Sequence, residues 1–478
     1  MSNATQSLAA TRIASLLDAN SFVEIGQSVT ARNTDFNLGG KKAPSDGVVT
    51  GYGICDGSLV YVYSQDVSVL GGTIGEMHAK KISSLYDLAI KMGAPIIGLI
   101  DCGGLRLEEA TDALQGFGEI YKKQVMASGV VPQITAILGS CGGGLAMFPA
   151  LTDFTFVEAG KGKLFVNSPN ALAGNTEAKK DTADAAYQAA ETGLVDGIGT
   201  EDEIFAKIRS LISLLPSNNE ADDNEVECAD DINRAVPDIA GMVANTGNAL
   251  SLLADDYDFF EIKPDYGKDI AAGFLRLNGT TVGAVANRSL VTDEEGKELW
   301  KGDETLSAAG AEKAADLVKF CDAFDIPVLT LTNVRGFKAD LCNEKKIAKS
   351  VGAMIAAFAD ATVPKVNVII GKAFGNAYVA MNSKAIGADV TLAWDSACVG
   401  MMDASLAAKI MYPKADAKEL SEKADAYGKL QNSIEMAAAR AVVDTVISAE
   451  DTRKYVIGSM EMLYTKREDR PTKKHGTV

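Results

Sequence analysis

The chain has 478 residues, of which 47% are hydrophobic, so it is long enough to bury two or more cores. Its formal net charge of −18 argues against general nucleic-acid binding, and its seven cysteines, without CxxC spacing, favour a reducing cytoplasm over a disulfide framework. No apolar run is long enough to span a bilayer, so we expect a cytoplasmic protein without direct membrane insertion.

The first half predicts an alternation of strands and helices. Residues 11–20 predict a short amphipathic helix, and residues 46–54 and 59–63 predict two strands joined by an Asp-Gly turn. The glycines in 71–75 then open a helix with an apolar stripe made of Ile82, Leu85, Ala89 and Met92. Residues 96–100 form the next predicted strand, and a glycine turn follows it.

The most informative stretch follows the predicted strand 131–138 and contains three consecutive glycines, Gly142, Gly143 and Gly144. A strand, a glycine turn and a helix start leave backbone N–H groups directed at one point, with no Cβ atoms in the way. Such a turn suits a developing oxyanion. A tight turn without function has the same local pattern.

We expect a domain boundary near Pro216. Residues 1–216 form the predicted first domain, the acidic and Asn-rich stretch 217–234 reads as a solvated linker, and residues 235–478 form the second domain.

The second half repeats these patterns. Residues 275–283 predict a hairpin with Asn-Gly at its turn, and residues 308–324 predict a helix. The expected core face of that helix comprises Ala314, Leu317, Val318 and Cys321. Strands are predicted at 328–331 and 363–370, and terminal helices at 434–446 and 452–463.

A constant spacing relates the two halves. Positions 95 and 327, 132 and 364, and 143 and 375 each differ by 232 and carry matching residues, which are proline, proline and glycine. A shared offset over about sixty residues indicates a tandem duplication of one unit.

Several motifs resemble one enzyme family. They comprise Asp46–Gly53, Gly71–Gly75, Gly142–Phe154, Phe320–Pro327 and Ala361–Lys365. The chain resembles the carboxyltransferase subunit of biotin-dependent acyl-CoA carboxylases and decarboxylases, the group of propionyl-CoA carboxylase β and methylmalonyl-CoA decarboxylase α. The resemblance implies an α/β fold of two tandem crotonase-like (ClpP/crotonase) ββα-superhelix domains, assembled as a homohexamer.

The resemblance also implies two oxyanion holes. The N–H groups of Gly143 and Gly144 would hold the thioester oxygen of an acyl-CoA, and those of Asn376 and Ala377 would hold the ureido oxygen of biotin. The acyl-CoA side would further include Gly103, Gly104, Leu105 and Gly142. The biotin side would include Gly336, Phe337, Phe374 and Gly375. No metal is implied.

The resemblance implies that biotin arrives on a separate carrier protein, with biotin carboxylase or a membrane decarboxylase subunit as a further partner. The substrate would be a short-chain acyl-CoA, with propionyl-CoA/methylmalonyl-CoA expected first. Two alternatives stay open, namely the α subunit of a sodium-pumping decarboxylase running the reverse reaction and a non-catalytic assembly homologue. The second is motivated by Asn376 and Arg335, which replace the usual glycine and proline of the family.

Three polar residues near these motifs have simpler interpretations. We expect His78 to be a structural histidine within a helix. We expect Asp101 and Arg106 to brace the first glycine turn rather than to touch substrate.

Overall fold

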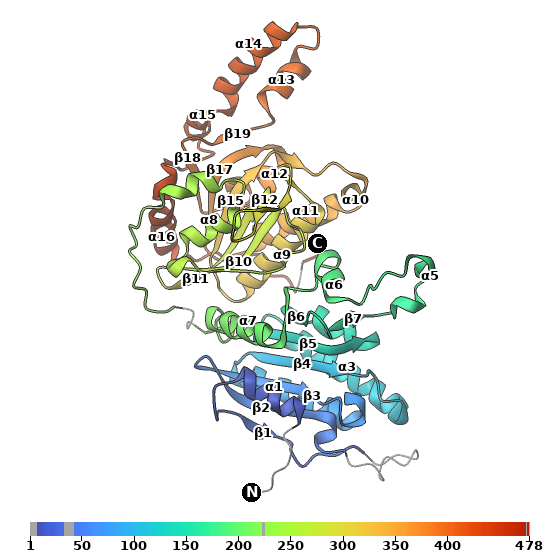
Figure 1. The fold of residues 1–478 in the computed structure, drawn as a ribbon. Coiled ribbons are helices and arrows are strands. Elements are labelled where there is room, and N and C mark those ends of the chain that lie inside the picture. Colours follow the sequence, from blue (N-terminus) through green and yellow to red (C-terminus); the bar gives the residue numbers. More distant parts are fainter. Residues whose placement is uncertain (1–6, 33–42, 222–224, 475, 478) are drawn as a thin grey trace. The chain divides into compact units, whose positions relative to one another are not determined.

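The structure is a computed structural model that describes residues 7–32, 43–221, 225–474 and 476–477. It divides into two compact units, residues 1–224 (unit 1) and 225–478 (unit 2). Each unit contains one large mixed sheet with helices packed on it (Figure 1). Among the described helices, none combines the length and the apolar character needed to cross a bilayer.

Unit 1 is built on an eight-stranded sheet with the order β1-β2-β3-β4-β5-β6-β8, in which β7 pairs with β5. Its strands are β1 (Val23–Ile25), β2 (Val48–Cys55), β3 (Ser58–Gln65), β4 (Ile96–Cys102), β5 (Gln133–Gly142), β6 (Phe154–Glu158), β7 (Lys163–Phe165) and β8 (Gly197–Gly199). The first three strands are antiparallel, and the strands from β3 to β8 are parallel to one another. Parallel strands require crossovers, which the helices supply.

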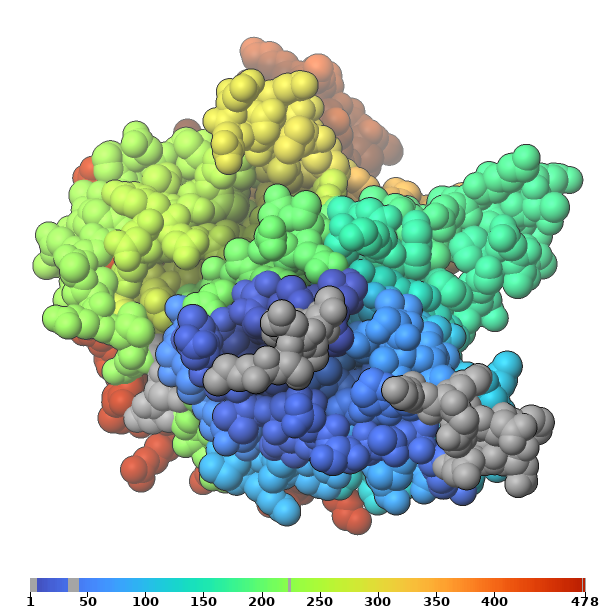
Figure 2. Space-filling view, turned by 60° about the horizontal axis from the view of Figure 1, so that its bottom comes forward, coloured from blue at the N-terminus to red at the C-terminus, as the bar shows by residue number. Residues whose placement is uncertain are grey.

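The helices of unit 1 are α1 (Leu8–Leu16), α2 (Glu76–Met92), α3 (Ala110–Ala127), α4 (Met147–Ala150), α5 (Asn175–Ala178), α6 (Ala185–Glu191) and α7 (Glu201–Leu214). Helix α2 begins after the predicted glycines and ends at Gly93, which adopts the left-handed conformation. The segment that carries α5 projects from the body of unit 1 (Figures 1 and 2).

Unit 2 has the same topology, since its sheet order is β9-β10-β11-β15-β17-β18-β20 with β19 paired to β17. Its main-sheet strands are β9 (Phe259–Glu261), β10 (Ile270–Leu277), β11 (Thr280–Asn287), β15 (Val328–Val334), β17 (Lys365–Phe374), β18 (Val390–Trp394), β19 (Cys398–Gly400) and β20 (Thr445–Ile447). Strands β4 and β15 begin at positions 96 and 328, and β5 and β17 begin at 133 and 365. Both pairs keep the spacing of 232, so the duplication seen in the sequence is a duplication of the fold.

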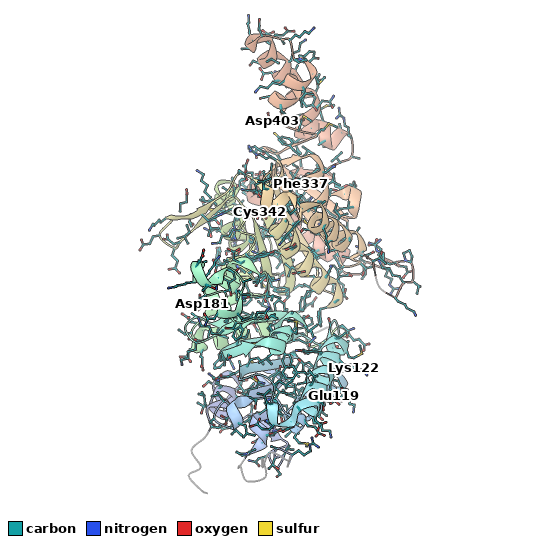
Figure 3. All side chains as sticks on the ribbon, turned by 90° about the vertical axis from the view of Figure 1, so that its right-hand side faces the viewer. Glu119, Lys122, Asp181, Phe337, Cys342 and Asp403 are labelled. Atoms are coloured by element: carbon teal, nitrogen blue, oxygen red, sulfur yellow. The ribbon has the colours of Figure 1, made fainter. Side chains whose placement is uncertain are left out.

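The helices of unit 2 are α8 (Thr246–Leu253), α9 (Ala308–Ala323), α10 (Leu341–Glu344), α11 (Ile347–Asp360), α12 (Gly375–Ala380), α13 (Ala404–Met411), α14 (Ala417–Tyr427), α15 (Ile434–Ala439) and α16 (Thr452–Leu463). Four short strands complete the unit, namely β12 (Leu290–Thr292), β13 (Glu298–Lys301), β14 (Thr305–Leu306) and β16 (Gly336–Phe337). Phe337 lies in the body of unit 2, whereas α13, capped by Asp403, and α14 form a projecting helical hairpin (Figures 1 and 3).

Most predicted elements are confirmed, and the differences have local causes. The predicted core face of α9 is buried, as are three of the four predicted core residues of α2. Met92 is 60% exposed because it is the last residue of α2, where the apolar stripe leaves the core. The helix predicted at 434–446 ends at Ala439, because Ala441 adopts φ +57° and residues 445–447 pair with β18.

A buried lysine ties the long helix of each unit to the chain at the start of a sheet strand, β2 in unit 1 and β10 in unit 2. Lys81 Nζ in α2 donates to Ser45 O at 3.1 Å, and Lys313 Nζ in α9 donates to Ile270 O at 2.9 Å. Burial lowers the pKa of Lys81 to about 8 and that of Lys313 to about 7. Carbonyl acceptors replace the water that each ammonium group loses.

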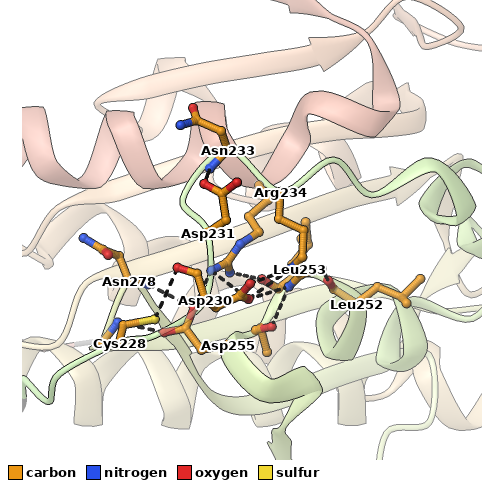
Figure 4. A network of polar contacts seen from close by, with 12 residues as sticks. Cys228, Asp230, Asp231, Asn233, Arg234, Leu252, Leu253, Asp255 and Asn278 are labelled. Atoms are coloured by element: carbon orange, nitrogen blue, oxygen red, sulfur yellow. Dashed lines mark hydrogen bonds and ion pairs between the residues drawn. The ribbon is translucent and has the colours of Figure 1, made fainter.

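A buried ion network fastens the beginning of unit 2 to its last helix (Figure 4). Arg453 is fully buried, and its Nη2 lies 2.6 Å from Asp255 Oδ1 and 3.1 Å from Asp230 Oδ2. Asp255 also accepts hydrogen bonds from the N–H groups of Asn278 and Gly279 at the β10–β11 turn. One buried arginine thus joins three segments that are far apart in the sequence.

We predict that Arg453→Met destabilises unit 2 by about 3–5 kcal/mol, because it leaves the buried carboxylate of Asp255 without its ion-pair partner. Urea unfolding followed by tryptophan fluorescence reports on unit 2 alone, since the chain has two tryptophans, Trp300 and Trp394, and both lie in it. The control is Lys454→Met, whose exposed ion pair with Asp451 is expected to contribute nothing measurable. Equal urea midpoints for the two variants would contradict the prediction.

Candidate active site

The glycine turn after β5 opens onto a cavity of about 620 Å³ in unit 1. Strand β5 ends at Gly142, and residues 143–146 form one 3₁₀ turn that leads into α4. The N–H groups of the first residues of such a turn have no acceptor within the turn itself. Gly143 and Gly144 therefore present backbone donors at the wall of the cavity.

Close packing explains why this stretch is rich in glycine. A Cβ atom on Gly142 would lie 2.5 Å from the ring of Phe165, and one on Gly139 would lie 2.1 Å from Asp101 Oδ1. Gly143 differs, because it adopts φ +64° and has no atom within 4 Å of its Cβ position. A side chain at Gly143 would therefore enter open space beside the donors.

The second predicted glycine turn lines the same cavity, through Gly103, Gly104 and Leu105. It is held by Gly103 N, which donates to Gly71 O at 2.9 Å, and by Ile74 N, which donates to Gly104 O at 2.9 Å. All the residues predicted for the acyl-CoA side are thus brought together in space.

Helix α3 supplies lining residues that the sequence analysis missed, Leu114, Phe117, Gly118 and Tyr121. The hydroxyl of Tyr121 donates to Gly144 O at 2.6 Å, and burial raises the pKa of this phenol, which keeps it protonated. The rings of Phe117, Tyr121 and Phe148 pack together with centroids 5.8–6.0 Å apart. The spacing of positions 114, 117 and 121 places them on one face of a helix, and this spacing is the sequence signal that could have identified them as a cavity wall.

A cluster of buried charges beside the two glycine turns is centred on Arg106. Its Nη1 lies 2.6 Å from Asp46 Oδ1 and 2.8 Å from Glu109 Oε1, and its Nη2 donates to Thr73 O at 2.7 Å. Burial raises the pKa of Asp46, and Arg106 opposes that effect. Asp101 in turn pairs with Arg12 at 2.9 Å. Both residues brace the turn, as predicted.

His78 is a structural residue, also as predicted. Its side chain is fully buried, with Nδ1 2.9 Å from Asp46 O and Nε2 3.2 Å from Gln65 Nε2. Burial lowers the pKa of His78 to about 3, so the imidazole is neutral. In the described part of the chain, no group of three or more His, Cys, Asp or Glu residues is arranged to hold a metal ion.

The equivalent turn of unit 2 follows β17. Gly375 is the first residue of α12 and adopts φ +63°, which is close to the φ of +64° at Gly143. Asn376 is exposed and Ala377 is buried, and the N–H groups of both belong to the first turn of α12. Strand β16, with Gly336 and Phe337, lies against α12, so the residues predicted for the biotin side are also brought together.

The two turns differ in which strand carries the bulky ring. In unit 1, Gly142 pairs with Phe165, whereas in unit 2 Phe374 pairs with Gly400. Phe374 is buried at the position where unit 1 has a glycine beside the cavity. The two halves therefore share a backbone but present differently shaped surfaces.

Comparisons with known proteins agree with this architecture. The carboxyl transferase domain family matches residues 3–478. The chain is 39% identical to the methylmalonyl-CoA decarboxylase subunit alpha of Propionigenium modestum, over 98% of this chain and 92% of that one. It is 38% identical to the propionyl-CoA carboxylase beta chain of Roseobacter denitrificans, again over 98% and 92%.

The fold matches the crystal structure of the transcarboxylase 12S hexamer with hydrolysed methylmalonyl-coenzyme A bound, with a TM-score of 0.90. That match has 34% sequence identity and covers 98% of this chain and 92% of the other. The two units are therefore tandem crotonase-like domains, as predicted. The chain belongs to the carboxyl transferase domain family.

Proposed function

We propose that this carboxyltransferase moves a carboxyl group between biotin on a separate carrier protein and a short-chain acyl-CoA. The observation that carries the proposal is the open cavity at Gly143 and Gly144, where two backbone donors meet an apolar wall. The similarity to acyl-CoA carboxylase and decarboxylase subunits supports the same reaction class.

The acyl-CoA side acts through its backbone. The enolate form of the thioester would carry negative charge on its oxygen, and the N–H groups of Gly143 and Gly144 would stabilise that charge, with the α-proton passing to bound biotin. Tyr121 donates to the carbonyl of Gly144, which anchors the turn that carries the donors. The lining from Leu105, Phe117 and Phe165 gives the acyl chain an apolar contact.

The residues of unit 2 fit a ureido ring. Gly336 has no atom within 4 Å of its Cβ position, so the chain leaves space at this residue of β16, a strand that contacts α12. Asn376 and Ala377 would donate to the ureido oxygen, and the exposed ring of Phe337 would contact the bicycle. Biotin, when bound, supplies or accepts the carboxyl group.

Direction and partners depend on other polypeptides. The carboxylase and the decarboxylase reactions use the same chemistry in opposite directions. The similarity to a methylmalonyl-CoA decarboxylase subunit makes the decarboxylase reaction the alternative to carboxylation. A biotin carrier is the required partner, with biotin carboxylase or a membrane decarboxylase subunit beside it. A non-catalytic assembly homologue would not need the open cavity at Gly143.

We predict that Gly143→Ala lowers kcat/KM for carboxyl transfer by about 10²-fold, because the methyl group enters the space beside the donors and moves the thioester oxygen away from them. The assay follows carboxyl transfer to a biotin carrier. The control is Gly57→Ala, which also has a positive φ (+82°) and open space but lies in the β2–β3 turn. Near-normal turnover of a folded Gly143→Ala enzyme would refute the acyl-CoA assignment.

We predict that propionyl-CoA/methylmalonyl-CoA is the preferred pair and that Leu105→Ala shifts the preference toward a longer acyl chain. One methylene in an apolar pocket changes discrimination by about 10-fold or more, so kcat/KM for butyryl-CoA should rise relative to propionyl-CoA by that order. The control is Leu107→Ala, because Leu107 is 81% exposed and is not among the lining residues of the cavity. Unchanged selectivity in Leu105→Ala would mean that the acyl chain lies elsewhere.

We predict a homohexamer in solution, because the matched transcarboxylase 12S core assembles as a hexamer. Light scattering with the purified chain measures the assembly directly. A fully active monomer would contradict this expectation.

A further inference from the structure

An ion pair unique to unit 2 lies beside its glycine turn. Lys372 Nζ in β17 is 2.6 Å from Glu304 Oε2, and the lysine side chain is 47% exposed. Asn333 holds the arrangement, since its Oδ1 accepts from Lys372 N at 2.9 Å and its Nδ2 lies 3.4 Å from Glu304 Oε1. Asn333 is buried, so the residue that positions the ion pair is itself held in place by its surroundings.

The duplication shows what this pair replaces. The positions 232 residues earlier are Gly72 and Ser140, so unit 1 has neither charge. Gly72 adopts φ +64° and Glu304 adopts φ +61°. A non-glycine residue in this conformation is strained by about 1 kcal/mol or more. The glutamate therefore occupies a position that the shared backbone suits to glycine.

The location of the pair follows from the same comparison. Ser140 lines the cavity of unit 1, so Lys372 stands at the equivalent place in unit 2. Lys372 lies two residues before Phe374 in β17, so both side chains leave the same face of the strand. Glu304 directly precedes β14, whose Thr305 pairs with Gly336. Both charges thus adjoin the residues assigned to the ureido ring.

We infer that Lys372 binds the carboxylate carried on the ureido ring, and that Glu304 occupies Lys372 as an internal carboxylate until that group arrives. The inference rests on the proposed function and adds a residue that distinguishes the carboxylated ring from the free one. An exposed ammonium group is a mobile point charge that exchanges one carboxylate for another. Its present partner has the same chemistry as the proposed ligand.

The neighbouring pair provides a matched control. Lys338 Nζ lies 3.6 Å from Asp303 Oδ1, one residue before Glu304 in the chain. Both residues line a separate cavity of about 280 Å³, whose lining includes neither Glu304 nor Lys372. Neutralising Lys338 therefore removes a similar charge from the same region without removing the proposed ligand contact.

The test compares two probes by NMR titration with the full chain. Biotin methyl ester presents the ureido ring alone, and its N1-carboxymethyl derivative adds a carboxylate beside the ring. We expect Lys372→Gln to weaken binding of the carboxymethyl probe by about 10-fold, with binding of the plain ester unchanged within about twofold. We expect Glu304→Gln to strengthen binding of the carboxymethyl probe, because the competing carboxylate is gone. Lys338→Gln should change neither.

The opposite signs of the two variants separate this role from a structural one. If Lys372 and Glu304 only stabilised the fold, both variants would weaken binding of both probes and lower the melting temperature together, and that result would overturn the inference. A wild-type chain that binds the plain ester but shows no effect of Lys372→Gln on the carboxymethyl probe would overturn the inference alone. A wild-type chain that binds neither probe would overturn the proposed biotin side as well.

Discussion

Each unit depends on a strand that is followed directly by a glycine with φ near +64°, Gly143 in one unit and Gly375 in the other. This conformation turns the chain from a buried parallel strand into a helix within one residue, and residues with a Cβ atom adopt it only at a cost. Because the turn is sharp, the next N–H groups point outward from the end of the sheet. The reaction proposed here uses backbone donors at that place.

Such donors work only if the backbone that carries them is rigid, and buried charge supplies that rigidity. Behind the turns of unit 1, Arg106 reaches Asp46, Glu109 and the carbonyl of Thr73. In both units a buried lysine of the long helix, Lys81 or Lys313, donates to backbone carbonyls. Charges in these positions are costly unless every partner is in place, so they fix the segments they join. Burial, and after it the positive charge of Arg106, lowers the pKa of His78 and keeps this buried imidazole neutral.

The duplication kept the backbone and changed the surfaces. The ring that belongs to β7 in unit 1, Phe165, has its counterpart on β17 in unit 2, Phe374, and the partner strand carries glycine each time. The exchange keeps one ring and one glycine at each pairing of the two strands. The pair of Glu304 and Lys372 likewise replaces an uncharged pair. Two halves with one fold thus present chemically different surfaces.

The sequence by itself determined the duplication, the main strands, the long helices and the glycine turns, because apolar periodicity and glycine clusters are local signals. Family resemblance added the assignment of Gly143, Gly144, Asn376 and Ala377, which stays a proposal. The contribution of α3 to the cavity was decided only in three dimensions, because Phe117 and Tyr121 approach Gly144 through packing of a helix that is distant in the sequence.

Tertiary contacts also overrode the secondary-structure preference of some segments. Residues 445 and 446 are predicted to end a helix, yet residues 445–447 pair with β18 because the open edge of the sheet gives their backbone groups partners. Glu304 carries no local sign of its role, since its conformation and its contact with Lys372 arise from the pairing of β14 with β16 and the position of β17. Contacts between distant segments set these features, and no local pattern encodes such contacts.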